Sequence, residues 1–323
     1  MDNVLCGYFW DHPIWDKQRR TVYLFPILMK KFIFKAIFFI GFFFILDNIV
    51  YKGLFILNSK TDFLCNKVLV KKPDIIFFGD SKCRYGIKPD IISQKTGMSS
   101  YNIARSGNGI LYSKGVESVI LSYYRPKLFV IQVMSLSSER EALVSLAPYL
   151  DNRKVKKLFS YYPLRVTAKY YLFRTSRYNS MLLTMIHRLF ANYDPNDGYV
   201  PLFGTSSMDK TKLSSEDSAG MPFSLSSGKN LLIEFIEEAK KNSVDMIMIN
   251  MPAMKEEKDV SCEIYKSIAK IYNIEFFDFS VSKENKYMRL QGDYFWDEGH
   301  LNNNGAGVFS SMLGSEIVKF IKK

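Results

Sequence analysis

The sequence predicts an α/β fold in which a parallel sheet follows one membrane-spanning helix. Short apolar runs of strand length alternate with longer stretches whose apolar residues recur at helical spacing, a rhythm typical of βαβ units. A phenylalanine-rich run near the N-terminus is long enough to cross a bilayer. With 323 residues, the chain can form one large core, or one domain with an insertion.

The membrane-spanning segment is expected at residues 32–50. It carries phenylalanine on every face, so it lacks the polar side that a soluble surface helix shows to water. Lys35 and Asp47 interrupt it, although Lys35 can snorkel from one end. The alternative is a buried helix of a soluble protein. Basic residues are denser before the segment than after it, which predicts a cytoplasmic N-terminus over residues 1–31 and an extracytoplasmic, periplasmic-side remainder.

Residues 51–72 are expected to form a stalk, and residues 73–323 the soluble domain. Its helices include one over about residues 305–322, and an insertion at about 139–229 separates the third and fourth strands. Five apolar runs are the predicted strands of the sheet: Ile75–Phe78, Ser100–Ile103, Leu128–Val133, Met246–Asn250 and Ile274–Phe277.

The first predicted strand ends at the tripeptide Gly79-Asp80-Ser81. A serine just beyond the carboxyl end of a buried parallel strand stands where open α/β sheets place their ligands. The N-terminus of the following helix would point its N–H groups toward that position. The alternative is that Asp80 and Ser81 only cap this helix, because both residue types are favoured there.

The chain has three histidines, so few bases are available to such a serine. His300 follows Asp297 by three residues, in a predicted loop before the last helix. In a turn, this spacing lets the carboxylate accept a hydrogen bond from imidazole Nδ1 and leaves Nε2 for a serine hydroxyl. The alternative is an ordinary histidine in a surface loop.

These two motifs, Gly79-Asp80-Ser81 and Asp297-Glu298-Gly299-His300, resemble the first and last sequence blocks of the SGNH (GDSL-type) hydrolases. The resemblance implies a three-layer α/β/α, flavodoxin-like fold with about five parallel strands. It also implies that Ser81 is the nucleophile, His300 the general base and Asp297 the carboxylate that orients the base.

The middle blocks of the family are less well matched. The stretch from Tyr101 to Gly107 resembles the second block, whose glycine gives an N–H to the oxyanion hole beside that of Ser81. The resemblance assigns this role to Gly107, with Gly109 as the alternative. The third block normally supplies an oxyanion-hole asparagine, and none follows the strand here. Ser135 or Ser137 is the expected substitute donor.

The insertion carries an unusual run of charge. From Asn152 to Tyr193 it has many lysines, arginines and tyrosines but no aspartate or glutamate. One interpretation is a solvated helical lid. The other is that the segment caps the active site and holds an anionic glycan or anionic lipid head groups beside Ser81. Its predicted contacts are Arg165, Lys169, Arg174 and Arg177.

Together these observations predict a serine-dependent acyl ester hydrolase or O-acyltransferase, with acetyl as the expected acyl group. The resemblance and the predicted topology suggest a cell-envelope polysaccharide or another acylated carbohydrate as substrate. The expected partners are the membrane and an integral-membrane acyl donor protein.

The sequence leaves two other functions open. A non-catalytic envelope protein with this fold would bind a glycan or a membrane partner. Nucleic-acid binding would explain the net charge of +12, but no nucleic-acid motif is present. No cofactor or metal is expected, because the sequence has neither metal-ligand spacing nor a nucleotide-binding fingerprint.

Overall fold

The computed structural model describes residues 13–61, 65–136, 141–190, 196–205, 224–254, 260–281, 288 and 293–323. The strands are β1 Ile75–Phe78, β2 Ser100–Asn102, β3 Leu128–Gln132, β4 Asp245–Asn250 and β5 Glu275–Asp278. The α-helices are α1 Pro13–Thr61, α2 Cys65–Lys71, α3 Ser81–Gly86, α4 Pro89–Thr96, α5 Ile110–Leu121, α6 Ala142–Leu146, α7 Arg153–Leu158, α8 Leu164–Leu172, α9 Leu182–Phe190, α10 Leu225–Lys241, α11 Val260–Ile271 and α13 Asn303–Ile321. Short 3-10 helices are η1 Ala147–Tyr149, η2 Phe159–Tyr161, η3 Arg174–Met181 and η4 Asn196–Gly198.

The five strands form one parallel sheet in the order β2-β1-β3-β4-β5, which confirms the predicted fold class. The chain moves outward from β1 to β2 and then returns to the other side of β1 to form β3. This reversal makes the gap between β1 and β3 the topological switch point, where open α/β sheets bind ligands at the carboxyl ends of their strands.

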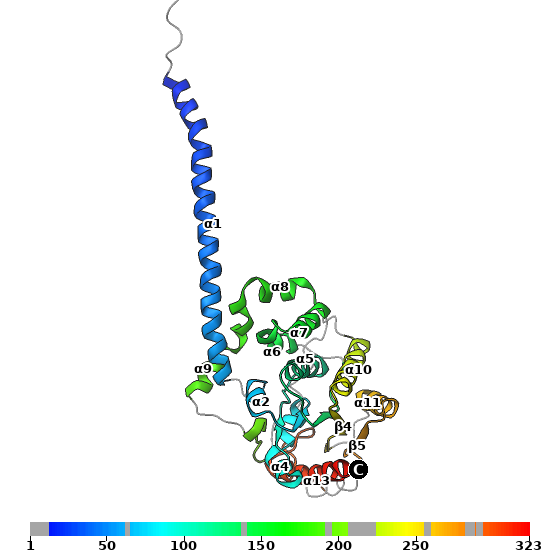
Figure 1. Ribbon diagram of the computed structural model, residues 1–323. Helices are drawn as coiled ribbons and strands as arrows, with labels where there is room; N and C mark the ends of the chain where they lie inside the picture. Colours follow the sequence, from blue (N-terminus) through cyan, green and yellow to red (C-terminus); the bar gives the residue numbers. More distant parts are fainter. Residues whose placement is uncertain are drawn as a thin grey trace, which may run out of the picture.

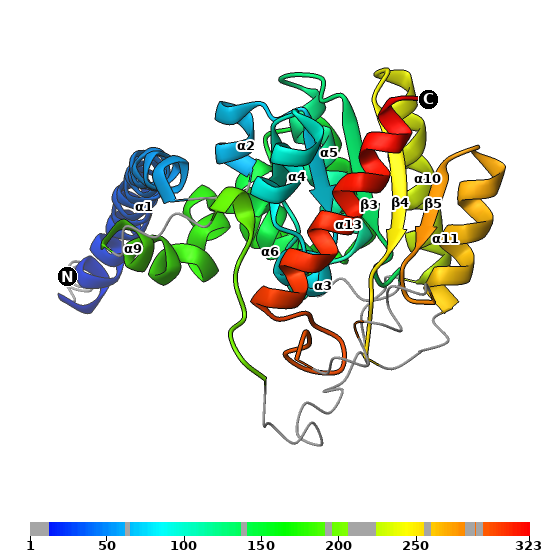
Figure 2. The ribbon, with the colours of Figure 1, turned by 90° about the horizontal axis from the view of Figure 1, so that it is seen from below.

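Helices cover both faces of the sheet (Figure 2). Because strand side chains alternate between faces, Phe77 and Val130 point toward α4 and α13, whereas Phe78 and Phe129 point toward α5 and α10. Helix α13, which the sequence periodicity near the C-terminus predicted, lies against α4. The result is a three-layer arrangement with a separate apolar core on each side of the sheet.

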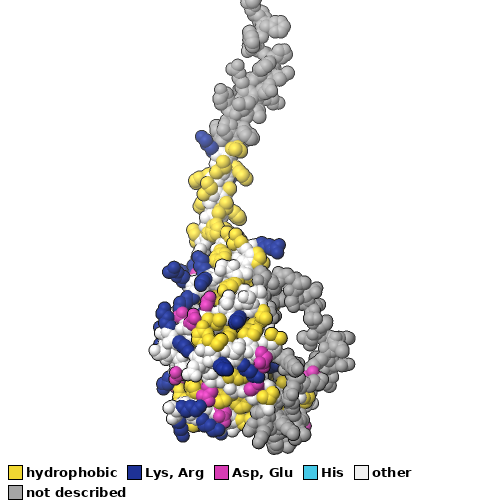
Figure 3. All heavy atoms as spheres, turned by 90° about the vertical axis from the view of Figure 1, so that its right-hand side faces the viewer, with side chains coloured by type: hydrophobic (Ala, Val, Ile, Leu, Met, Phe, Trp, Pro, Cys, Tyr) yellow, Lys and Arg dark blue, Asp and Glu magenta, His cyan; other side chains and the backbone are white. Residues whose placement is uncertain are grey.

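Helix α1 projects far beyond the rest of the protein (Figure 1). Its segment Met29–Thr61 is long and apolar enough to cross a membrane, and only 6% of its most apolar window is buried inside the protein. Figure 3 shows hydrophobic side chains along this helix, whereas the globular part carries charges of both signs. The helix therefore suits a membrane rather than a soluble core.

The C-terminal part of α1 is packed against the insertion. The Tyr51 ring packs against the Tyr178 ring in a tilted arrangement, with centroids 5.8 Å apart, and its hydroxyl donates a hydrogen bond of 3.0 Å to Asp151. Asp47 accepts hydrogen bonds from Arg174 N at 2.8 Å and from Thr175 Oγ1 at 2.6 Å. Within 51–72, the segment expected as a stalk, α1 continues to Thr61 and α2 follows from Cys65. The insertion thus attaches the soluble domain to the C-terminal part of α1.

Replacing Asp47 with alanine should loosen this attachment. Asp47 is 6% exposed, and its loss leaves the N–H groups of Arg174 and Thr175 without their acceptor. An unsatisfied buried donor costs about 1–3 kcal/mol, so thermal unfolding in detergent should shift to lower temperature. Ser59→Ala, an exposed change on the same helix, is the control and should have little effect. Identical melting of the Asp47→Ala and native proteins would contradict this account.

Candidate active site

The turn after β1 brings Ser81 to the carboxyl edge of the sheet. Asp80 caps α3 by accepting a hydrogen bond of 2.8 Å from Lys82 N, and Ser81 is the first helical residue. Gly79 is required for close packing here, because a Cβ atom at this position would lie 2.4 Å from Cys83 Cβ and 2.6 Å from Gln132 Oε1. The serine backbone N–H therefore lies at the helix N-terminus, among the groups without an intrahelical partner.

The loop before α13 brings a histidine and a carboxylate to this serine. The Ser81 Oγ and His300 Nε2 atoms are 2.8 Å apart, although the residues are separated by 219 positions in sequence. On the other side of the ring, His300 Nδ1 lies 3.0 Å from both carboxylate oxygens of Asp297. The carboxylate selects the tautomer with the proton on Nδ1, so Nε2 can accept the serine proton.

Asp297 is held ionised by its own turn. Burial raises the pKa of this carboxyl, but hydrogen bonds from the N–H groups of Gly299 and His300, at 2.7 and 2.9 Å, and from the imidazole lower it further. The net result is an Asp297 pKa below the ordinary value of 3.8. A charged carboxylate on Nδ1 stabilises the imidazolium that forms when Nε2 takes a proton.

Gln132 is a site residue that the sequence analysis missed. It ends β3, is 1% exposed and accepts a hydrogen bond of 3.0 Å from Asp80 N through Oε1. Its Nε2 donates to the carbonyl of Val133. Gln132 therefore holds the turn that carries Ser81. Because Gly79 has no Cβ atom, the Gln132 side-chain amide can approach the backbone of this turn. The sequence signal was a single polar residue at the end of an apolar strand.

Tyr85 and Asn102 support the same turn. The Tyr85 ring meets the His300 ring edge to face at 5.7 Å, and its hydroxyl accepts a hydrogen bond of 3.0 Å from Ser106 Oγ. Asn102, fully buried at the end of β2, donates to the carbonyls of Cys83 and Ile87 at 2.9 and 3.1 Å. These contacts fix α3 relative to the loop after β2.

The predicted oxyanion-hole residues lie at the same edge of the sheet. Gly107 is in the loop between β2 and α5 with φ +71°, a left-handed conformation that favours glycine, and Gly109 caps α5. Ser135 follows β3 and is exposed, whereas Ser137 lies outside the described residues. No group of three or more His, Cys, Asp or Glu side chains that could hold a metal ion occurs in the described part of the chain.

The four predicted substrate-binding cations divide into two pairs. Arg174 and Arg177 contact the protein itself: they form ion pairs of 2.6 and 2.9 Å with Asp151, and Arg177 is 7% exposed. Both guanidinium groups also lie over the Tyr51 ring of α1. These contacts join the insertion to α1, and the expected contact of the two side chains with substrate stays a prediction. Arg165 and Lys169 are exposed on α8.

Comparisons with known proteins add little beyond this geometry. No protein-family model matches the sequence, and no curated protein matches it. Among solved structures, the chain is similar to a candidate acylhydrolase from Bacteroides fragilis NCTC 9343, with 15% identity and a TM-score of 0.35 over 76% of this chain and 86% of that one. A Bacillus subtilis protein is 13% identical, with a TM-score of 0.41 over 77% of this chain and 56% of that one. A candidate lipolytic protein of the G-D-S-L family from Desulfitobacterium hafniense DCB-2 is 13% identical, with a TM-score of 0.36 over 75% of this chain and 97% of that one. Sequence identities and TM-scores this low do not assign a function to this chain.

The lowered pKa of Asp297 predicts how the effect of Asp297→Asn on the free energy of unfolding changes with pH. A carboxyl with a depressed pKa in the folded state contributes stability above its unfolded pKa and loses that contribution as pH falls through the folded value. The free energy of unfolding of the native protein should therefore exceed that of Asp297→Asn at pH 7, and the difference should shrink below about pH 5. Urea titrations followed by circular dichroism measure it. Asp245→Asn, an exposed substitution, is the control, and an Asp297→Asn difference that is constant with pH would contradict the assignment.

Proposed function

We propose that the protein is a serine esterase or acyltransferase of the SGNH (GDSL-type) class that acts on acylated carbohydrate. The observation that carries this proposal is the array of Ser81 Oγ, His300 Nε2 and Asp297, joined by hydrogen bonds of 2.8 and 3.0 Å. Such an array supplies a nucleophile, a general base and an orienting carboxylate. The blocks around Ser81 and His300 also resemble those of the class in sequence.

In the proposed reaction, His300 Nε2 takes the proton of Ser81 as Oγ attacks the ester carbonyl. The carbon–oxygen bond to the leaving alcohol then breaks, the alcohol takes the proton from His300, and the acyl group stays on Ser81. In the second half, His300 removes a proton from water or from a sugar hydroxyl, whose oxygen attacks the acyl carbon. The bond from that carbon to Ser81 Oγ breaks, and His300 returns the proton to Oγ. Hydrolysis and transfer share every step except the identity of this last nucleophile.

The N–H groups of Ser81 and Gly107 are the proposed donors to the tetrahedral oxyanion. The third donor of the class, an asparagine side chain after the third strand, is missing from this sequence. Loss of one such donor lowers the rate by about 10²–10³-fold in other serine enzymes. Ser135 is the proposed replacement among the described residues, so we expect a slower enzyme than one with the asparagine.

We propose an envelope polysaccharide as the substrate and acetyl as the acyl group. The support is the apolar helix α1, which would tether the domain at the membrane surface, together with the excess of basic residues before the helix. A periplasmic-side domain would have envelope glycans within reach. The proposed partner is an integral-membrane protein that supplies acyl groups, because a tethered transferase needs a donor on its own side of the bilayer.

Helix α8 is the part of the domain proposed to contact the bilayer. Its C-terminal neighbour Phe173 packs against Phe43 and Phe44 of α1, with ring centroids 5.6 and 6.3 Å away, at the level of the apolar run. Figure 1 shows α8 on the side of the domain toward which α1 projects. Leu164 and Leu172 are exposed there, and Arg165 and Lys169 would meet anionic head groups.

The alternative is a non-catalytic envelope protein that keeps this fold to bind a glycan. The observation that favours it is the missing oxyanion-hole asparagine. Against it stands the hydrogen-bonded array itself, because a binding scaffold has no need of a serine, a histidine and a carboxylate in line. The activity of serine and histidine variants separates the two functions.

Ser81→Ala should abolish release of acetate from acetylated envelope glycan or from a small acetate ester. Because members of such an array act as a unit, His300→Ala should also lower turnover by roughly 10⁴-fold or more. His187→Ala is the matched control, since His187 is an exposed residue of α9, and should leave turnover unchanged. Turnover by Ser81→Ala at the native rate would remove Ser81 from the mechanism, whereas no turnover by the native protein would favour the non-catalytic alternative.

The proposed topology predicts that the C-terminus lies outside the cytoplasm. A reporter enzyme that works only outside the cytoplasm, fused after Lys323, should be active. A reporter that works only inside should be inactive at the same position. The opposite pattern would reverse the orientation and remove the support for an envelope substrate.

A further inference from the structure

A cavity of about 370 Å³, with Arg84 of the Ser81 helix α3 in its wall, lies between three separate parts of the chain. One wall comes from the end of α1, a second from η3 and α9, and a third from α3, α6 and the loop after β2. Its size is within the range of small-molecule sites. Neither the hydrogen-bonded array nor the proposed mechanism accounts for it.

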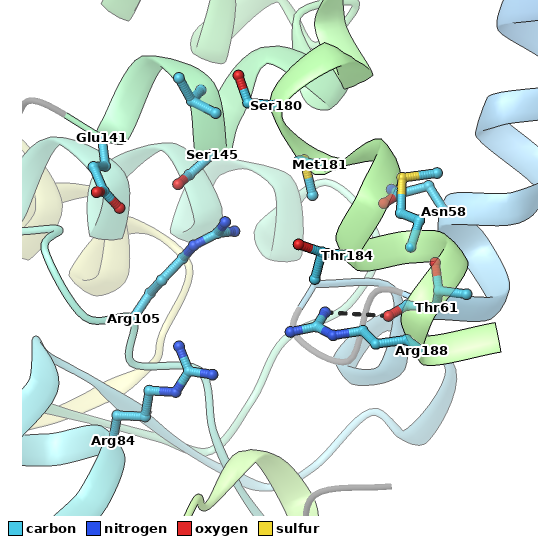
Figure 4. A pocket seen from close by; sticks show the side chains of 12 residues that line it. Asn58, Thr61, Arg84, Arg105, Glu141, Ser145, Ser180, Met181, Thr184 and Arg188 are labelled. Atoms are coloured by element: carbon cyan, nitrogen blue, oxygen red, sulfur yellow. Dashed lines mark hydrogen bonds between the residues drawn. The ribbon is translucent and has the colours of Figure 1, made fainter. Parts of the chain in front are cut away.

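The cavity is strongly basic. Arg84, Arg105 and Arg188 line it, and among the described lining residues Glu141 is the one acidic side chain. Figure 4 shows the guanidinium ends of the three arginines pointing into a common space. Within the described residues, neither Arg84 nor Arg105 forms an ion pair. We call this site the arginine pocket. Planar guanidinium groups match the oxygens of phosphates and carboxylates.

Buried polar atoms in the same walls lack a partner. Among the described residues, no hydrogen bond satisfies Asn58 Oδ1, Arg84 Nε or Ser145 Oγ. The Asn58 and Ser145 residues are only 1% and 2% exposed. Buried polar groups are nearly always hydrogen-bonded, so unpaired ones around a cavity indicate that a polar ligand completes the site. Asn58 Oδ1 can accept a hydrogen bond from a ligand hydroxyl, whereas the guanidinium groups can bind an anion.

The arginine pocket is connected to the proposed active site by short stretches of chain. Arg84 lies one turn after Ser81 in α3, and the N–H of Arg105 donates to the carbonyl of Gly79 at 3.1 Å. A Cβ atom at Gly107 would be 3.3 Å from the Glu141 carboxylate. A ligand held by the arginines would therefore have its neighbouring groups close to the serine.

We propose that the arginine pocket binds the phosphate or carboxylate of an anionic, hydroxyl-bearing carbohydrate whose ester faces Ser81. This inference rests on the proposed function for the reaction, but the binding site stands on its own geometry. The arginine pocket would hold the anionic group of the substrate in a fixed position. Arg174 and Arg177, which contact Asp151 and Tyr51, are not needed for this binding. It also explains why α1 contributes Asn58 and Thr61 to the wall of a site in the soluble domain.

Calorimetric titration of the full chain in detergent micelles tests the proposal with three probes. Glucuronate carries a carboxylate, glucose 6-phosphate carries a phosphate, and glucose carries neither. At low salt, at least one charged probe should bind more tightly than glucose, and the preferred one identifies the anionic group. Arg84→Gln/Arg105→Gln should weaken that binding at least tenfold. Arg153→Gln/Lys322→Gln removes two exposed cations elsewhere and should leave it unchanged.

A second variant tests the cavity without removing charge. Thr184→Trp, on the exposed side of α9, should fill the arginine pocket and also abolish binding of the charged probe. All titrations are repeated in the Ser81→Ala background, so loss of catalysis is separated from loss of binding. Failure of both charged probes to bind, or equal affinity in the native protein and both pocket variants, would overturn the proposal. Normal anion binding by a protein with no esterase activity would overturn only the proposed function.

Discussion

The parallel pairing of β1 with β2 and β3 is the constraint on which the rest of the structure depends. Parallel strands bring their carboxyl ends to one edge, so the segments that follow them meet there whatever their distance in sequence. Ser81 follows β1, the loop with Gly107 follows β2, and Gln132 ends β3. The site is built from these three strand ends, and the histidine arrives from a fourth segment.

The fourth segment depends on helix packing. α13 lies against α4 on one face of the sheet, and the turn that carries Asp297 and His300 comes directly before α13. Asn302 caps α13 by accepting hydrogen bonds from the N–H groups of Asn304 and Gly305 at 3.0 Å each. The apolar core under α13 thus fixes His300, and buried Gln132 fixes the turn that carries Ser81. Each partner of the 2.8 Å contact is positioned by its own set of buried contacts.

Much of the fold followed from local patterns. The apolar run Ile75–Phe78 became β1 with the same bounds, and the final helix predicted near 305–322 became α13 at Asn303–Ile321. These elements were predictable because a buried parallel strand is continuously apolar and a helix on a sheet has one apolar face. The serine and histidine motifs were also visible in the sequence, and the structure brings them together, while their catalytic roles are predictions.

The remaining features depend on contacts between segments far apart in the sequence. The acid-free run in the insertion suggested cations free for a ligand, but Asp151 lies just before that run and binds two of its arginines. The sequence gives no sign that Tyr51 of α1 completes this cluster. Likewise, Arg84, Arg105 and Arg188 come from three elements, and only tertiary packing makes them neighbours. The charge of a sequence window therefore did not identify which arginines lie together at one cavity.

The central claim is that Ser81 acts as a nucleophile activated by His300. The most direct measurement is the reaction of the intact protein with a fluorophosphonate, followed by peptide mass spectrometry to locate the adduct. The account predicts one adduct, on the Ser81 hydroxyl, that forms far more slowly in His300→Ala and at the native rate in His187→Ala. An adduct on another residue, or equal labelling of Ser81→Ala, would contradict it.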